Sequence, residues 1–121
     1  MTKVLLDTNF ILSGIRKKID FFEEISFMGF KIIIPIQVIN EIKRLSISKK
    51  KLKFREEASF ALKLLEKNNF EKIDLKYNYV DKGIKKFIEK NPKIIVATLD
   101  SELKKKLKKK LIIRGQKLEL Q

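Results

Sequence analysis

Short apolar runs alternate along this chain with longer segments in which apolar residues recur every three or four positions. The runs are rich in Ile, Val and Leu and predict buried strands, of which KIIVAT at 93–98 is the clearest. The longer segments predict amphipathic helices. We expect strands at 3–6, 31–34, 70–75, 93–98, 111–114 and 117–120, and helices at 10–15, 19–28, 35–45, 55–67, 79–89 and 100–109.

The order of these elements predicts one α/β domain over residues 1–121. Strands separated by helices favour a mostly parallel sheet with right-handed crossovers. Only four Gly and two Pro occur, and no repeat is visible, so we expect no linker. Two helices have clear apolar faces, formed by Ile36, Ile39, Ile42 and Leu45 in the third helix and by Leu103, Leu107 and Leu111 in the last.

The composition limits the chemistry that this chain can perform. It contains no Cys and no His, which excludes disulfides, thiolate or imidazole zinc sites and every nucleophile that works with a histidine. No run of 18 apolar residues occurs, and the N-terminus does not have the pattern of a signal peptide, so we expect a cytoplasmic protein that does not bind membranes. Any catalysis must use carboxylates, hydroxyls, Lys, Arg or Tyr.

The chain is strongly basic, with 29 Lys and Arg against 15 Asp and Glu and a formal net charge of +14. Such a charge attracts polyanions, nucleic acid first. A genome rich in A and T, which favours Lys and Ile codons, is an alternative origin of much of this charge.

Two segments concentrate the basic residues, SKKKLKFR at 48–55 and KKKLKKK at 104–110. We interpret them as a surface that contacts RNA phosphates, and the alternative is a solvated helix face. Tyr77, Tyr79 and Phe54 are candidates for base stacking, although core packing is the alternative for Phe54. The proposed phosphate contacts are Lys49, Lys50, Lys51, Lys53, Arg55, Lys105 and Lys108.

Four acidic residues occupy positions that suit a metal site. Asp7 and Asp100 stand at or just after the carboxyl ends of predicted buried strands, the edge at which open α/β sheets bind ligands. Asp81 opens a predicted helix, and Glu41 lies inside one. Carboxylates gathered in one place repel each other, so they protonate or bind cations, and oxygen ligands select Mg²⁺ or Mn²⁺.

Each of these acids also has a purely local explanation. Asp7 and Asp100 could cap the helices that follow them. Asp81 could interact with a helix dipole or pair with Lys85, and Glu41 could pair with Arg44. The four acids together are a more specific pattern than any one of them.

The motifs that contain these acids resemble the PIN domains. The matching segments are LLDTNFIL at 5–12, VINEIKRL at 38–45, YVDKGIKKF at 79–87 and IIVATLDSELKKKL at 94–107. The last segment, IIRGQKLEL at 112–120, resembles the archaeal rRNA-processing branch of that family. The resemblance covers essentially the whole chain.

This resemblance implies a three-layer α/β/α sandwich around a mostly parallel sheet of about five strands in the order 3-2-1-4-5. That order places the first and fourth strands, and so Asp7 and Asp100, side by side. The family's catalytic and metal-binding acids fall on Asp7, Glu41, Asp81 and Asp100. The supporting positions that it implies are Thr8, Asn9, Thr98 and Glu102.

The activity implied is that of an endoribonuclease which uses Mg²⁺ or Mn²⁺ to activate water for phosphodiester hydrolysis. An rRNA precursor is the expected substrate, in ribosome maturation. The alternatives are a VapC-like toxin nuclease paired with an antitoxin and a non-catalytic RNA-binding module. A protein partner or a homodimer remains open.

Overall fold

The computed structural model describes all 121 residues, which form six strands and six helices joined by loops. No helix has the length and apolar character that crossing a membrane requires. The elements are β1 (Lys3–Leu6), α1 (Thr8–Arg16), α2 (Phe21–Phe27), β2 (Lys31–Pro35), α3 (Ile36–Ser46), α4 (Leu52–Lys67), β3 (Glu71–Ile73), α5 (Val80–Lys90), β4 (Ile95–Ala97), α6 (Ser101–Lys106), β5 (Lys110–Arg114) and β6 (Lys117–Leu120).

The strands form one sheet in the order β3-β2-β1-β4-β5-β6. Strands β1 to β5 are parallel, and β6 adds to the edge as an antiparallel strand. Gly115 makes the turn between β5 and β6 with φ +63, a conformation that glycine adopts without steric cost. The predicted order 3-2-1-4-5 is therefore confirmed, with the last short strand paired beyond it.

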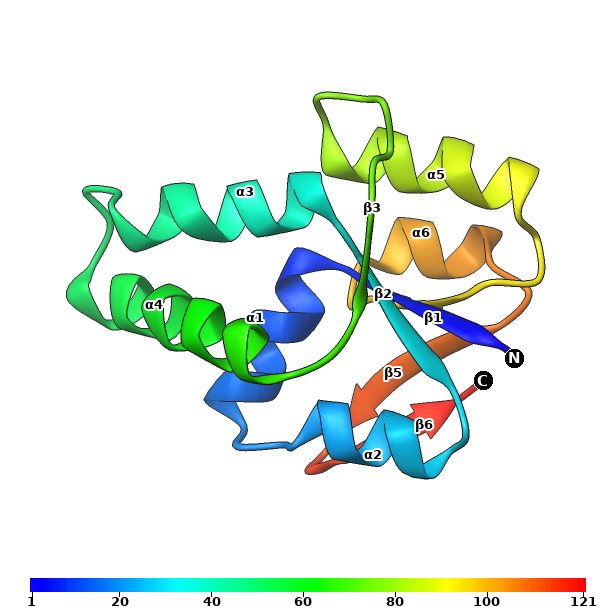
Figure 1. The fold of residues 1–121 in the computed structure, drawn as a ribbon, viewed down its shortest axis with the longest axis horizontal. Coiled ribbons are helices and arrows are strands. Elements are labelled where there is room, and N and C mark those ends of the chain that lie inside the picture. Colours follow the sequence, from blue (N-terminus) through cyan, green and yellow to red (C-terminus); the bar gives the residue numbers. More distant parts are fainter.

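Helices cover both faces of the sheet (Figure 1). The chain moves outward from β1 to β3 and then returns to the centre at β4, so right-handed crossovers put α1 to α4 on one side and α5 and α6 on the other. Strands β1 and β4 are neighbours whose crossovers leave in opposite directions. Their carboxyl ends form the switch point at which such sheets bind ligands.

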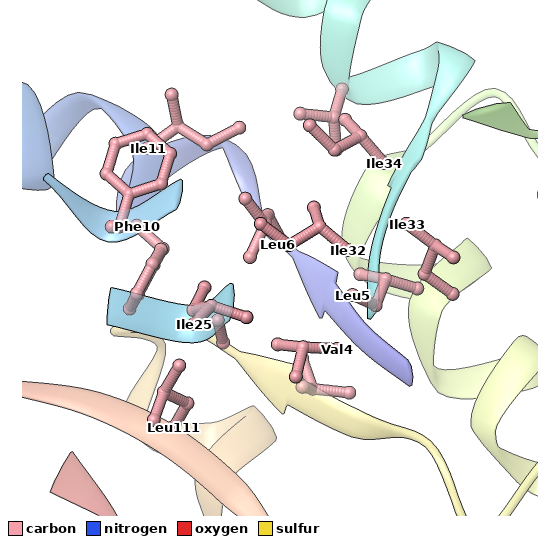
Figure 2. Close-up of a cluster of buried hydrophobic side chains, with 14 of the residues drawn as sticks. Val4, Leu5, Leu6, Phe10, Ile11, Ile25, Ile32, Ile33, Ile34 and Leu111 are labelled. Atoms are coloured by element: carbon pink, nitrogen blue, oxygen red, sulfur yellow. The ribbon is translucent and has the colours of Figure 1, made fainter. Parts of the chain in front are cut away.

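The core explains why the central strands are continuous apolar runs. Val4, Leu5 and Leu6 of β1 are fully buried because helices pack on both faces of the sheet. Figure 2 shows these side chains beside those of Ile32, Ile33 and Ile34 in β2, with α1 and α2 adding Phe10, Ile11 and Ile25. This contiguous core holds the strand ends in fixed positions.

Two predicted helix faces differ from the observed ones. Helix α6 ends at Lys106 instead of continuing to 109, because Leu107 is extended (φ −99, ψ 135), and Leu111 belongs to β5. The predicted leucine stripe was therefore wrong as a helical face, although Leu103, Leu107 and Leu111 are all buried.

In α3 the fully buried residues are Val38 and Ile42, whereas Ile36 is half-buried. Ile39, Ile42 and Leu45 of the predicted face do pack against the core, so only its first position was wrong: Val38 is buried there and Ile36 is not.

Candidate active site

Asp7 lies directly after β1 and is buried, with 4% of its surface exposed. Its backbone N–H donates to the carbonyl of Ala97 at 3.0 Å, which extends the pairing of β1 with β4. Its carboxylate accepts at both oxygens: Oδ1 from the Thr8 N–H at 2.8 Å and Oδ2 from the Thr98 hydroxyl at 2.9 Å. The side chain is therefore fixed at the switch point while it caps α1.

Burial raises the pKa of Asp7 from 3.8 to about 6. The hydrogen bonds from Thr98 and Thr8 oppose this rise, and the negative charges of Asp81 and Glu41 add to it. Two acids from distant parts of the chain thus lie close enough to act on Asp7. The free-energy cost of the buried negative charge would be lowered by a bound proton or a nearby cation.

Glu41 and Asp81 come from two helices that begin at this edge of the sheet. Glu41 is half-buried in α3, and Asp81 is exposed in the first turn of α5. The ion pairs with Arg44 and Lys85 that would explain these acids locally do not form. The position of Asp81 in the first turn still suits the helix dipole.

Asp100 sits in a different setting from Asp7. It is half-exposed and caps α6, where its Oδ1 accepts from the N–H groups of Glu102 at 2.9 Å and Leu103 at 3.2 Å. Its own N–H donates to the Thr98 hydroxyl at 3.1 Å. Since that hydroxyl also donates to Asp7, Thr98 joins the two strand ends through a single oxygen atom.

The remaining supporting residues are placed unequally. Thr8 is buried at 2% exposure, and its hydroxyl has no hydrogen-bond partner. Asn9 and Glu102 are exposed on the first turns of α1 and α6. A buried hydroxyl without a partner next to Asp7 is a polar atom that a bound ligand or water could satisfy.

The side chains at this edge suit a hard divalent cation in kind but do not form a closed site. Every side-chain ligand available here is an oxygen, as Mg²⁺ and Mn²⁺ prefer. The raised pKa of Asp7 indicates that its negative charge is unfavourable when buried and would be stabilised by a nearby cation. As the side chains lie, however, no three acidic residues together could hold an ion.

The basic residues lie on two separate parts of the surface. Lys49, Lys50, Lys51 and Lys53 are exposed around the turn between α3 and α4. Arg55 is half-buried in α4, and its Nε is buried without a partner.

Lys105 and Lys108 belong to the other predicted basic segment, and both are exposed. Helix α6 follows its cap Asp100, and the chain then returns to the amino edge of the sheet, where β5 begins. Lys108, in the connection before β5, therefore lies far from the carboxylates along this helix.

A hollow at the opposite edge of the sheet has different chemistry. It measures about 800 Å³ and lies where β2 and β3 begin, lined among others by Phe22, Phe30, Lys31 and Phe70. None of the four predicted acids lines it. Its size alone gives no reason to place the chemistry there.

Gln37 is a positioning residue that sequence reasoning missed. Its Nε2 donates to Asp74 Oδ1 at 2.8 Å, and its Oε1 accepts from the Leu75 N–H at 3.1 Å. These bonds tie the first turn of α3 to the loop that precedes α5, and so relate the elements that carry Glu41 and Asp81. A single Gln in a helix carries no motif, so only the fold could reveal this role.

Comparison with known proteins shows the family to which this chain belongs. The protein family described as a PIN like domain matches residues 4–114. The ribonuclease VapC4 of Methanocaldococcus jannaschii is 36% identical over 110 residues, which cover 88% of this chain and 83% of that protein.

Two solved structures share the fold. The PIN domain endonuclease Utp24 aligns with a TM-score of 0.80 at 24% identity and covers 98% of this chain and 90% of its own. VapBC2 from Rickettsia felis, bound to a DNA fragment from its promoter, aligns with a TM-score of 0.53 at 17% identity, covering 86% and 92%. With the family match over nearly the whole chain, these findings establish that the chain belongs to the PIN-like domain family.

Proposed function

We propose that this protein is an endoribonuclease that hydrolyses RNA phosphodiester bonds with the help of Mg²⁺ or Mn²⁺. The observation that carries the proposal is the carboxylate of Asp7 at the switch point of the sheet, whose pKa is raised to about 6 by burial, with a smaller contribution from the charges of Asp81 and Glu41. The relative named as a ribonuclease and the fold shared with a named endonuclease support it. Asp7 and Asp100 would hold the main ion, and Glu41 and Asp81 a second ion or the attacking water.

The proposed reaction is attack of water on phosphorus, with a carboxylate of this chain accepting the proton of the water. The oxygen of a water bonds to phosphorus and the bridging P–O bond breaks, while the water proton passes to a carboxylate and the leaving oxygen takes up a proton. Thr98 keeps the Asp7 carboxylate in one orientation through its hydroxyl. The cation, when bound, lowers the pKa of water and stabilises negative charge on the oxygens.

The basic turn between α3 and α4 would hold the RNA through its phosphates. Glu41 lies about 8 Å of helix from the end of α3, and Lys49, Lys50 and Lys51 follow that end, so the turn extends outward from the carboxylates. Lysines that contact phosphates release counterions on binding. RNA binding should therefore weaken steeply between about 50 and 200 mM salt, and a flat response would argue against RNA as the partner.

The first test is cleavage of single-stranded and structured RNA with Mg²⁺, Mn²⁺ or EDTA. The Asp100→Asn variant is assayed beside the protein, with Asp20→Asn as the matched control, because Asp20 also caps a helix but outside the carboxylate edge. Metal-dependent cleavage that is lost only in Asp100→Asn supports the proposal. Salt-sensitive RNA binding without cleavage would instead indicate a non-catalytic module.

The pathway has two candidates. Processing of rRNA precursors is supported by the resemblance of the C-terminal segment at 112–120 to the archaeal rRNA-processing branch. A toxin nuclease is supported by the relative named VapC4 and by the fold shared with a VapBC complex. Expression in a host without an antitoxin separates them: arrest of growth that requires Asp7 indicates a toxin, whereas unchanged growth with cleavage of precursor rRNA in vitro indicates a processing enzyme.

A further inference from the structure

The loop between β3 and α5 is held firmly beside the carboxylate edge. In Figure 1 it continues beyond the carboxyl end of β3 and then bends back sharply to the start of α5. Asp74 Oδ1 accepts from Gln37 of α3 and also from the Lys76 N–H, each at 2.8 Å, and Leu75 is buried at 4% exposure. The loop is therefore ordered by its own hydrogen bonds and by one buried side chain.

Gly83 allows this loop to lie against α5. A Cβ at that position would come within 3.0 Å of the Leu75 side chain and 3.3 Å of the Tyr77 Cβ, so any larger residue would push the loop away. The Tyr77 ring also lies 6.0 Å from the ammonium group of Lys82, within the range of a cation–π contact. Tyr77 is thus used within the protein.

Tyr79 is not used in this way. It is 77% exposed at the N-cap position of α5, where its side chain makes no capping hydrogen bond. The next residue, Val80, is buried and fixes the backbone that carries the ring. Tyr79 stands where α5 begins, at the edge of the sheet where β1, β2 and β3 end, and Asp81 lies in the first turn of the same helix.

From this placement we propose that Tyr79 stacks on a base of unpaired RNA and positions the neighbouring phosphate at the carboxylate edge. The proposal rests on the proposed ribonuclease function and names the residue that would hold a base of its substrate. An exposed aromatic ring on a fixed backbone binds bases without reading their sequence, because every base has a π face. Lys76 and Lys82, which precede and follow Tyr79 in the sequence, are both exposed and add positive charge to this part of the surface. A duplex offers no free base face, so its binding does not use Tyr79.

The test measures RNA binding without cleavage. Oligoribonucleotides of about 12 nucleotides carry 2-aminopurine at successive positions and are titrated in EDTA with wild type, Tyr79→Ala, Tyr79→Phe and Phe27→Ala. Phe27 is the matched control, because it is 86% exposed at the end of α2. We expect Tyr79→Ala to weaken single-strand binding by roughly 5- to 150-fold and to remove the quenching at one position of the oligonucleotide.

The controls separate this proposal from the function on which it rests. Tyr79→Phe and Phe27→Ala should bind as wild type does, and Tyr79→Ala should bind a duplex of the same length unchanged. Salt-sensitive binding by wild type with no effect of Tyr79→Ala overturns the stacking role alone and leaves Tyr79 available as a protein contact. No binding by wild type overturns the stacking proposal, whereas the ribonuclease function is decided by the cleavage assay with Mg²⁺ or Mn²⁺. A thermal melt of Tyr79→Ala that matches wild type shows that a loss of binding does not come from unfolding.

Discussion

Strands β1 and β4 end in a similar way, yet their aspartates have different surroundings. Each strand leads to an Asp that caps the next helix. Asp7 follows β1 directly and remains inside the sheet at 4% exposure, with both oxygens bonded. Asp100 comes three residues after the end of β4 and is half-exposed, with hydrogen bonds to one oxygen. The number of residues between the strand and the aspartate therefore decides how deeply its carboxylate is buried.

The largest expected effect of this difference is on catalysis. Asp7→Asn should lower kcat/KM for RNA cleavage by roughly 10³-fold, about 4 kcal/mol, because the amide removes the charge that attracts a cation and can accept a proton. The hydrogen bond from Thr8 can persist to the amide oxygen, so the fold should be retained. Single-turnover cleavage measures the effect, and Asp20→Asn should keep full activity. Near-normal activity of Asp7→Asn would remove Asp7 from the mechanism.

The second effect is on stability, which Asp7→Asn should raise although it lowers catalysis. Because the folded pKa of Asp7 is about 6 against an ordinary 3.8, the folded state binds the proton more tightly. The stability contributed by this group is present below pH 3.8 and is lost as the pH rises through 6. The free energy of unfolding of Asp7→Asn should therefore exceed that of wild type by up to about 3 kcal/mol at pH 8. Near pH 4 the two values should differ little.

Urea unfolding of both proteins across this pH range measures the difference in their free energies of unfolding. The effect of pH on the other charged groups is the same in both proteins and cancels in that difference. Mg²⁺ at pH 8 should raise the melting temperature of wild type more than that of the variant, since an ion bound by the native carboxylates stabilises the native state. An equal difference in stability at pH 4 and pH 8 would contradict the burial of a charged Asp7.

Thr98 joins the two strand ends, so its removal should affect both. Thr98→Val keeps the shape but deletes the bond to Asp7 and leaves the Asp100 N–H without its acceptor, at a cost of about 1–3 kcal/mol. Since the Thr98 hydrogen bond lowers the pKa of Asp7, its loss should also raise that pKa further. Thr98→Ser, which keeps the hydroxyl, is the control and should remain closer to wild type in denaturant unfolding.

The central part of the fold could be predicted from the sequence because buried strands leave a strong pattern. Apolar runs such as those at 3–6 and 93–98 are long enough to identify β1 and β4, and the strand order followed from the family resemblance. The end of α6 could not be read in the same way. Leu103, Leu107 and Leu111 fit a helical period, but burial in a loop and a strand satisfies the same three residues.

The places of the acidic residues in the fold were more predictable than their contacts. Motifs placed Asp7 and Asp100 at strand ends, and the fold puts them there. The bridging of both by Thr98 depends on the pairing of β1 with β4, a contact between residues 91 positions apart that no local pattern contains. The hydrogen bonds of Gln37 are equally non-local.

The smallest predicted effect concerns Asp100 as a helix cap. Asp100→Ala should lower stability by about 1 kcal/mol, because the Glu102 and Leu103 N–H groups lose their acceptor, whereas Asp100→Asn should cost little since Asn caps well. Denaturant unfolding at one pH measures both variants. If Asp100→Asn then loses cleavage at full stability, Asp100 serves the substrate or its ion in addition to the helix. If both variants cleave RNA as wild type does, the cap explains Asp100 completely, and the functional part of the switch point lies with Asp7 and the acids that act on it.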